Sequence, residues 1–328
     1  MFTRMNKLGG LRKPFVFIIN FNKTRVHVYE LHDIPSNVFL QFEERLFGKK
    51  TKSDLLSGKV SPVMKMKKAV NYKKYLLAFD TVMEEMRAGN TYLLNLTFPT
   101  SVDLTMTLPE LFFTTQAKFK CCFADKFLSF SPERFIKMEN DKIFTYPMKG
   151  TSPVKEDDYG DKLMQSEKEE TEHLMIVDLL RNDLDIVAGD VRVEKFRYKE
   201  KINTGSGSIW QTSSEVCGRL NADWHENIGN ILNALLPAGS ISGTPKPSTL
   251  EIIKKLEQDS RGYYTGIFGY YDGEMLDSAV AIRFVESNSH GYFYRSGGGL
   301  TIDSEPQKEY QELLDKVYLP VLGKKEEG

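Results

Sequence analysis

The sequence predicts an α+β fold built on antiparallel β-sheets. Segments with the apolar pattern of strands outnumber those with helical periodicity. Most predicted strands follow one another directly, without the helix that a parallel crossover usually supplies. No self-similarity appears at a period of about 20–50 residues, which excludes a repeat array. The 328 residues suffice for one large domain or two ordinary ones.

The first half of the chain predicts a hairpin, then helices and further strands. Pro14–Leu31 alternates around an Asn-Lys turn and predicts a β-hairpin. The Ser- and Lys-rich stretch Lys49–Lys68 predicts a solvated connection, and Asn71–Ala88 predicts a helix that ends at Gly89. The next predicted elements are strands at Thr91–Phe98, Phe119–Phe130 and, as a pair, within Phe135–Pro147, and a helix at Leu108–Ala117.

The second half begins with a loop that contains glycine and proline, residues 148–153, before a long predicted helix, Tyr159–Val187. A glycine-rich turn at Gly239–Pro245 opens a later helix. The remaining predicted strands are Val191–Tyr198, Ser208–Leu220, Tyr263–Tyr271, Met275–Val285 and Gly291–Ser296. The remaining predicted helices are Trp224–Leu236, Ser248–Glu257 and Pro306–Val317.

Composition narrows the class of protein. The formal net charge of −1 gives no reason to expect binding to nucleic acid or to an anionic membrane. No apolar stretch is long enough to span a membrane or to serve as a signal peptide. The cysteines Cys121, Cys122 and Cys217 are odd in number and two are adjacent, which favours reduced thiols. These features predict a cytoplasmic protein.

Familiar catalytic and cofactor motifs are missing. The five histidines lack metal-ligand spacing, and no nucleophile elbow of the GxSxG type is present. The glycine clusters at 205–207 and 297–299 do not continue to the last glycine of the GxGxxG pattern. They also lack the strand–helix setting of a dinucleotide-binding motif. Nucleotide binding is therefore not expected.

Two carboxylate pairs point to a divalent cation. Glu169 and Glu172 are three residues apart on the long predicted helix, and Glu309 and Glu312 repeat the spacing on the last one. Residues three apart share a helix face, and carboxylates suit a hard cation such as Mg²⁺. Glutamates at this spacing are also common on solvated helix surfaces, and the spacing does not choose between these interpretations.

Three further features favour anion binding or catalysis. Lys149 lies in the glycine-flanked loop, where it could reach into a cleft or simply be solvated. Arg283 follows the apolar segment Ser278–Ile282, so it should pair with a bound anion or with an internal carboxylate. The turn at Gly239–Pro245 could present backbone N–H groups to a carboxylate or serve as an ordinary helix cap.

Six motifs, taken together, carry a family resemblance. They are Ser131-Pro-Glu-Arg-Phe, Pro147-Met-Lys-Gly-Thr, Glu172-His-Leu-Met-Ile with Asp178-Leu-Leu-Arg-Asn-Asp-Leu, Gly239-Ser-Ile-Ser-Gly-Thr-Pro-Lys, Gly297-Gly-Gly-Leu, and Glu309-Tyr-Gln-Glu-Leu-Leu-Asp-Lys. In this order they resemble the chorismate-utilising enzymes, the large subunits of anthranilate, aminodeoxychorismate, isochorismate and salicylate synthases. The resemblance covers residues 70–320 approximately.

The resemblance implies a fold and a domain division. The family fold, that of anthranilate synthase component I, packs two antiparallel sheets orthogonally with helices outside. It implies a shortened N-terminal region with the hairpin at residues 1–68, a chorismate-binding catalytic domain at 69–322 and a disordered tail at 323–328. The N-terminal region has no match to the Leu-Leu-Glu-Ser segment of tryptophan-regulated members, so feedback by tryptophan is not expected.

The resemblance also implies roles for individual residues. Glu172 and Glu312 would hold Mg²⁺, supported by Glu169 and Glu309, and Glu133 would protonate the departing C4 hydroxyl of chorismate. The residues expected to hold the substrate are Arg283, Tyr264, Lys316, Ser240, Gly297, Gly299 and Gln211. Gln211 stands where the family has a histidine, and it can donate a hydrogen bond but cannot take a proton.

Lys149 discriminates among family members. At the position that matches Lys149, the anthranilate synthases that this chain resembles carry alanine. The aminodeoxychorismate synthases that it resembles carry lysine. The resemblance therefore implies attack by Lys149 on C2 of chorismate, followed by ammonia at C4, to give 4-amino-4-deoxychorismate. Leu93 stands where isochorismate-type enzymes place a water-activating lysine.

The implied partners are a separate glutamine amidotransferase subunit, which supplies ammonia, and a downstream aminodeoxychorismate lyase on the route to p-aminobenzoate and folate. The alternatives are an anthranilate synthase component I and, from another class, a chorismate-binding subunit without turnover.

Overall fold

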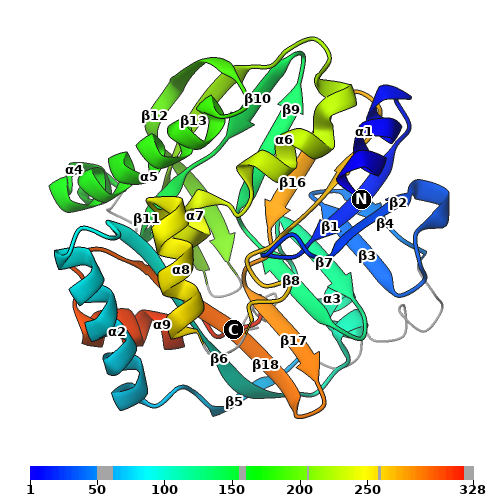
Figure 1. The fold of residues 1–328 in the computed structure, drawn as a ribbon. Coiled ribbons are helices and arrows are strands. Elements are labelled where there is room, and N and C mark those ends of the chain that lie inside the picture. The colour runs from blue at the N-terminus through cyan, green and yellow to red at the C-terminus, as the bar shows by residue number, and fades with distance from the viewer. Residues whose placement is uncertain (50–61, 155–159, 205–206, 258–259, 321–328) are drawn as a thin grey trace.

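The computed structural model describes residues 1–49, 62–154, 160–204, 207–257 and 260–320 (Figure 1). Two nine-stranded sheets, antiparallel at every described pairing, form the centre of this part of the chain. The predicted α+β class is therefore confirmed. None of the described helices is both long and apolar enough to cross a membrane. The predicted tail at 323–328 and most of the predicted connection at 49–68 lie outside the described residues.

The first sheet follows the order β11-β13-β10-β9-β16-β15-β1-β2, with β12 paired to β13. Its strands are β1 (Phe15–Ile19), β2 (Val26–Glu30), β9 (Arg134–Glu139), β10 (Lys142–Thr145), β11 (Met148–Pro153), β12 (Gly189–Thr204), β13 (Gly207–Arg219), β15 (Ile267–Tyr271) and β16 (Leu276–Val280). The predicted hairpin forms, since β1 pairs with β2, and β1 also pairs with β15. A division of the chain at residue 68 remains a prediction.

The second sheet follows the order β14-β6-β18-β17-β8-β7-β3-β4, with β5 paired to β6. Its strands are β3 (Val38–Phe42), β4 (Arg45–Phe47), β5 (Met64–Lys68), β6 (Leu93–Leu104), β7 (Phe119–Phe123), β8 (Phe127–Ser131), β14 (Gly243–Thr244), β17 (Phe284–Asn288) and β18 (Gly291–Leu300).

Helices cover the outer faces of the sheets (Figure 1). They are α1 (Phe2–Gly10), α2 (Tyr72–Arg87), α3 (Leu108–Thr114), α4 (Asp161–Gln165), α5 (Glu167–Asp185), α6 (Ile228–Leu235), α7 (Gly239–Ser242), α8 (Lys246–Leu256) and α9 (Pro306–Asp315), with 3₁₀ turns at Leu31–Asp33 and Trp224–Asn227. Helix α5 packs against β11, β12 and β13, whereas α9 packs against β18.

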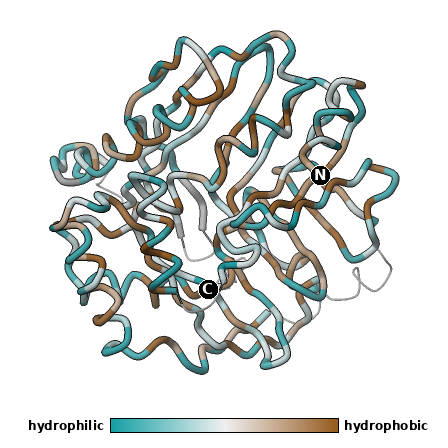
Figure 2. The backbone as a smooth tube through the Cα atoms, in the orientation of Figure 1, coloured by the Kyte–Doolittle hydropathy of each residue, from teal (hydrophilic) through white to brown (hydrophobic). Residues whose placement is uncertain are grey.

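Strand β1 shows why the sheets stack. Its five apolar residues are all buried, and alternate side chains enter different cores. Phe15 and Phe17 pack beneath α1 and α6, whereas Val16 and Ile18 face the second sheet, beside Leu40. Figure 2 shows hydrophobic residues along the inner strands, β1 among them, and alternating colours along the outer helices. A strand with both faces buried has to be apolar throughout, and this one is.

Several predicted boundaries were wrong for local reasons. The segment predicted as a loop at 148–153 is strand β11, which tolerates its glycine through a bulge after Met148. The predicted helix Tyr159–Val187 divides at Ser166, whose hydroxyl caps α5 by accepting from the Glu169 N–H. Phe119–Phe130 and Met275–Val285 each span parts of two strands, and helix α1 and strands β3 to β5 were not predicted.

Candidate active site

All thirteen of the predicted site residues line one cavity of about 640 Å³. They are Glu133, Lys149, Glu169, Glu172, Gln211, Ser240, Tyr264, Arg283, Gly297, Gly299, Glu309, Glu312 and Lys316. Strands β11 and β13 with helix α5 contribute one group, and β18 with α9 contributes another. Leu93, noted above for its place in the resemblance, also lines this cavity. The structure brings the residues together, and their individual roles remain predictions.

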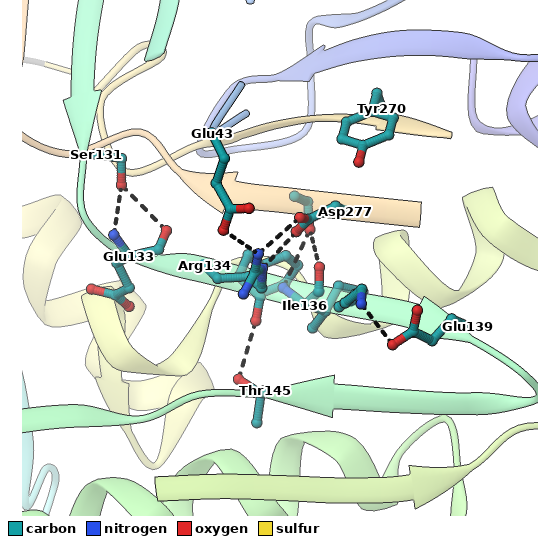
Figure 3. Close-up of polar contacts among 12 residues, drawn as sticks. Glu43, Ser131, Glu133, Arg134, Ile136, Glu139, Thr145, Tyr270 and Asp277 are labelled. Atoms are coloured by element: carbon teal, nitrogen blue, oxygen red, sulfur yellow. Dashed lines mark hydrogen bonds and ion pairs between the residues drawn. The ribbon is translucent and has the colours of Figure 1, made fainter. Parts of the chain in front are cut away.

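Glu133 lies in the connection from β8 to β9 and is anchored along its backbone. The Ser131 hydroxyl accepts from the Glu133 N–H at 3.1 Å and donates to its carbonyl at 3.3 Å (Figure 3). Its side chain accepts a hydrogen bond from the Ser240 hydroxyl, with 2.7 Å between the two oxygens. Burial raises the pKa of this carboxyl, and Ser240, Arg283 and Lys316 only partly oppose the shift. A carboxyl with a raised pKa holds its proton more readily, which suits it to act as an acid.

Lys149 lies on β11, within the bulge between Met148 and Thr151, and not in a loop as the sequence predicted. The next residue, Gly150, has φ +86°, and the Thr212 hydroxyl of β13 donates to the Lys149 carbonyl. The ammonium forms an ion pair with Glu172, with 2.9 Å between Nζ and Oε2. Burial lowers the pKa of Lys149, but Glu172, Glu312 and Glu309 outweigh it and raise the pKa above its ordinary value. The lysine is therefore not simply solvated.

The two carboxylate pairs face the same cavity from α5 and α9. Glu309 accepts a hydrogen bond from Ser304 at 2.9 Å, and Glu312 forms an ion pair with Lys316 at 2.6 Å. Two glycines leave room for these side chains. A Cβ built on Gly298 would lie 3.3 Å from Glu309 Oε2 and 3.6 Å from Glu312 Oε1, and one on Gly150 would lie 2.6 Å from Glu169 Oε2.

This donor set fits Mg²⁺ in the way that enzymes bind it with a substrate. Among the described residues, no group of three or more His, Cys, Asp or Glu side chains converges as a ready-made metal cage. Mg²⁺ is commonly held by one or two carboxylates, with substrate oxygens and water completing the octahedron. Glu172 and Glu312, one on each helix, suit that arrangement.

Cationic and polar groups line another part of the cavity. No carboxylate of the described chain lies within 4 Å of the Arg283 guanidinium, so the internal ion pair considered from the sequence does not form there. Its ring neighbour is Tyr318, 5.6 Å from the guanidinium carbon to the ring centre. Lys316 donates to the Gly297 carbonyl at 2.8 Å. Tyr264 is buried, which raises its pKa to about 12 and keeps it a neutral donor.

A partly buried ion pair beside the site was not predicted from the sequence. Asp183 of α5 and Lys246 of α8 meet at 2.9 Å, and Asp183 also accepts from the Gly239 N–H at 3.1 Å. Both residues stand inside the motifs that carried the resemblance, which was the available signal. The two residues are 63 positions apart in the chain (246 − 183), so their spacing could not predict that they pair.

Comparisons with known proteins agree with this geometry. Residues 15–321 match the family described as chorismate binding enzyme. An uncharacterized PabA-like protein of Haemophilus influenzae is 45% identical over 318 residues, which cover 97% of this chain and 95% of the relative. Aminodeoxychorismate synthase component 1 of Salmonella typhimurium is 40% identical over 199 residues, which cover 58% of this chain and 42% of that protein.

A solved structure places the fold. The crystal structure of anthranilate synthase component I from Streptococcus pneumoniae superimposes with a TM-score of 0.66 at 28% identity, covering 78% of this chain and 59% of that one. Because the family match spans nearly all of the described residues and the site motifs meet in one cavity, this chain belongs to the family of chorismate binding enzymes.

Proposed function

We propose that this chain converts chorismate and ammonia into 4-amino-4-deoxychorismate. Overall similarity does not choose between this reaction and anthranilate synthesis, because the matches include proteins with either name. The observation that carries the proposal is the Lys149 side chain, which lines the cavity together with Glu133. Anthranilate synthases resemble this chain but have alanine at that position, which offers no nucleophile.

Substrate binding follows from the charges around the cavity. Chorismate carries two carboxylates, and Arg283 and Lys316 are among the cations that line the cavity, beside Lys149, Arg295 and Lys308. Arginine can grip a carboxylate through two parallel N–H groups. Gly297 and Gly299 also line the cavity, and their backbone N–H groups would donate to the substrate as well. At Gly297, a Cβ would lie 2.2 Å from the Leu96 carbonyl oxygen.

The metal has a limited part in the proposal. Glu172 and Glu312, with Glu169 and Glu309 beside them, would hold Mg²⁺, which neutralises a substrate carboxylate and polarises the adjoining ring when bound. The bond changes and proton transfers proposed below involve chorismate, ammonia, water and the side chains of Lys149 and Glu133.

The chemical step joins two displacements of the same kind. The neutral amine of Lys149 forms a bond to C2, the ring double bond shifts, and the C4–O bond breaks. The hydroxyl leaves as water with the proton of Glu133. Ammonia then bonds to C4, the double bond shifts back, and the C2–N bond to Lys149 breaks, which releases the neutral lysine amine. The new C4 ammonium returns one proton to the Glu133 carboxylate, so that chorismate and ammonia give the amino product and water. Since Glu172 favours the protonated form of Lys149, their ion pair has to open and the lysine has to release one proton to water before attack. The lysine regains that proton from water after the product forms.

Replacement of Lys149 tests the proposal. In Lys149→Ala, formation of 4-amino-4-deoxychorismate from chorismate, Mg²⁺ and ammonium should fall by about 100-fold or more, because the nucleophile is gone. Products are resolved by chromatography with mass detection. Lys137→Ala, which removes a half-buried lysine from β9 outside the cavity, is the matched control and should keep its activity.

Intact-protein mass spectrometry gives a direct view of the covalent step. Wild type with chorismate and Mg²⁺, but without ammonia, should gain mass that maps to Lys149. The same product at an unchanged rate from Lys149→Ala would refute the covalent route. Anthranilate as the wild-type product would assign the chain to the other reaction, and binding without any product would leave a chorismate-binding subunit.

A further inference from the structure

We propose that Ser240 is a positioning residue for Glu133, and that two ion pairs, one partly buried and one buried, clamp the short helix α7 so that the Ser240 hydroxyl meets the Glu133 carboxyl. The resemblance had suggested that Ser240 contacts the substrate. The inference deepens the proposed function, in which Glu133 is the acid, and rests on it.

The backbone around Glu133 is fixed independently of its side chain. The Val280 N–H donates to the Glu133 carbonyl at 3.1 Å, in addition to the two contacts of Ser131. Arg134, the next residue, forms an ion pair with Asp277 at 2.8 Å on the other side of the strand (Figure 3). With its neighbours held on both sides, the Glu133 carboxyl still needs a partner to fix its own rotamer. The Ser240 hydroxyl at 2.7 Å is that partner.

Helix α7 is too short to hold itself, because its four residues fall below the length at which a helix is stable alone. Its first residue, Gly239, donates its N–H to Asp183, whose other carboxylate oxygen meets Lys246. A Cβ on Gly239 would lie 2.6 Å from Asp183 Oδ2, so the close approach requires glycine. Lys246 also donates to the Leu235 carbonyl at 3.1 Å, which joins the ends of α6 and α8 to this clamp.

The other end of α7 is held by a second ion pair. Arg261 donates to the Ile241 carbonyl at 2.8 Å and to the Asn95 carbonyl of β6 at 2.7 Å. Its carboxylate partner is Glu257, 2.6 Å away, and both side chains are almost fully buried. Buried charges with fully used hydrogen bonds resist displacement, because removal of one partner leaves the other uncompensated. Ser240 therefore sits between two fixed points.

The contact has a chemical consequence for the acid. A hydroxyl that donates to a carboxylate favours the charged form, and so it limits how far burial raises the pKa of Glu133. The other charged groups that face Glu133 are Arg283, before β17, and Lys316, at the end of α9. Asp183 and Lys246 neutralise each other behind α7. Loss of Ser240 should therefore strengthen proton binding by Glu133 while leaving the two cations in place.

The test is the pH dependence of kcat/KM for chorismate consumption. An acid works only while protonated, so activity falls as pH rises through its pKa. In Ser240→Ala this alkaline limb should move to higher pH by about one unit, since one hydrogen bond to an ionised group is removed. Ser240→Thr, which keeps the hydroxyl, should restore the wild-type limb. Asp183→Asn should move the limb in the same direction, whereas Asp178→Asn, on the exposed face of α5, should not.

Several outcomes would overturn the inference. A raised KM with an unmoved limb in Ser240→Ala would mean that Ser240 binds substrate. A lower rate at every pH with an unmoved limb would mean a merely structural part. Thermal melts identify any variant that has not folded.

Failure of the proposed function is recognised separately. Carbon-13 NMR of labelled glutamate carboxyls, with the Glu133 signal assigned by Glu133→Gln, follows this titration in the free protein whichever product is formed. An upward shift in Ser240→Ala together with a different product would retain the inference and refute the proposed reaction. No shift would overturn the inference whatever the product.

Discussion

Glu133 and Lys149 share one cavity but lie in different electrostatic surroundings. Burial raises the pKa of Glu133, whereas three carboxylates outweigh burial at Lys149 and raise the pKa of its ammonium. The proposed reaction uses the two groups in opposite ways. Glu133 has to give up its proton to the leaving hydroxyl, and Lys149 has to lose its proton before it can attack.

Replacement of Glu133 by glutamine separates these two parts. Glu133→Gln keeps the shape and the Ser240 contact but removes the acid, so kcat should fall by about 100-fold or more, with chorismate affinity changed less than about threefold. Rapid-quench kinetics and a binding titration measure the two quantities. Glu139→Gln, at the far end of β9 and outside the cavity, is the control. Turnover within about threefold of wild type would rule out Glu133 as the acid.

At the residue scale, the sequence predicted which side chains belong to the cavity better than it predicted their partners. All thirteen candidates meet in one place, although Glu169, Gln211, Tyr264 and Arg283 stand outside the six motifs. The Ser240–Glu133 contact was not predicted, because 107 positions separate the two residues and nothing local relates them. The Lys149–Glu172 ion pair was missed for a similar reason, since it depends on how α5 packs on β11.

At the scale of elements, hydrophobic periodicity predicted a helix or strand correctly where tertiary packing agreed with it. Helix α2 begins one residue after Asn71, whose side chain caps it, and ends beside the predicted stop. Strand β11 escaped prediction because glycine and proline usually mark a loop, and only pairing with β13 turns the segment into a strand. Tertiary pairing overrode the local signal there.

Gly243 provides a stability test of the joint between α7 and β14. Its φ is +134°, and a Cβ would lie 1.9 Å from the Leu93 carbonyl oxygen. Gly89 also has a positive φ, +77°, but has open space where a Cβ would stand. Gly89→Ala should cost about 1–2 kcal/mol from conformation alone. Gly243→Ala should exceed it by about 2 kcal/mol or more, because backbone has to move. Denaturant unfolding measures both, and equal losses would contradict the packing argument.

Helices α5 and α9 together carry the metal prediction. Activity with ammonium should require Mg²⁺, and Glu172→Gln or Glu312→Gln should raise the Mg²⁺ concentration for half-maximal activity by about tenfold or more. Glu167→Gln, in the exposed first turn of α5, should leave it unchanged. Calorimetric titration of Mg²⁺ with chorismate present supplies a readout apart from turnover. Undiminished turnover in EDTA would end the metal assignment.

At the scale of the whole molecule, two sheets produce a core between them and further cores under the outer helices. The site residues come from segments between Glu133 and Lys316, and they meet only because both sheets close around them. The sequence predicted an antiparallel α+β class, but not the strand order, since strands as distant as β1 and β15 pair. Strand order follows from the shared core and not from any single segment.

The source of ammonia also belongs to this scale. A glutaminase needs an accessible thiolate, and all three cysteines of this chain are buried in its cores. Burial raises the pKa of the Cys121 and Cys217 thiols further from the range of a reactive thiolate. We therefore expect glutamine to support turnover only when a separate amidotransferase subunit is added, whereas ammonium salts suffice alone. Product analysis with each nitrogen donor, with and without that subunit, measures the difference. Cys217→Ser should leave ammonium-dependent activity intact, and glutamine-dependent synthesis by this chain alone would show that it contains a glutaminase centre.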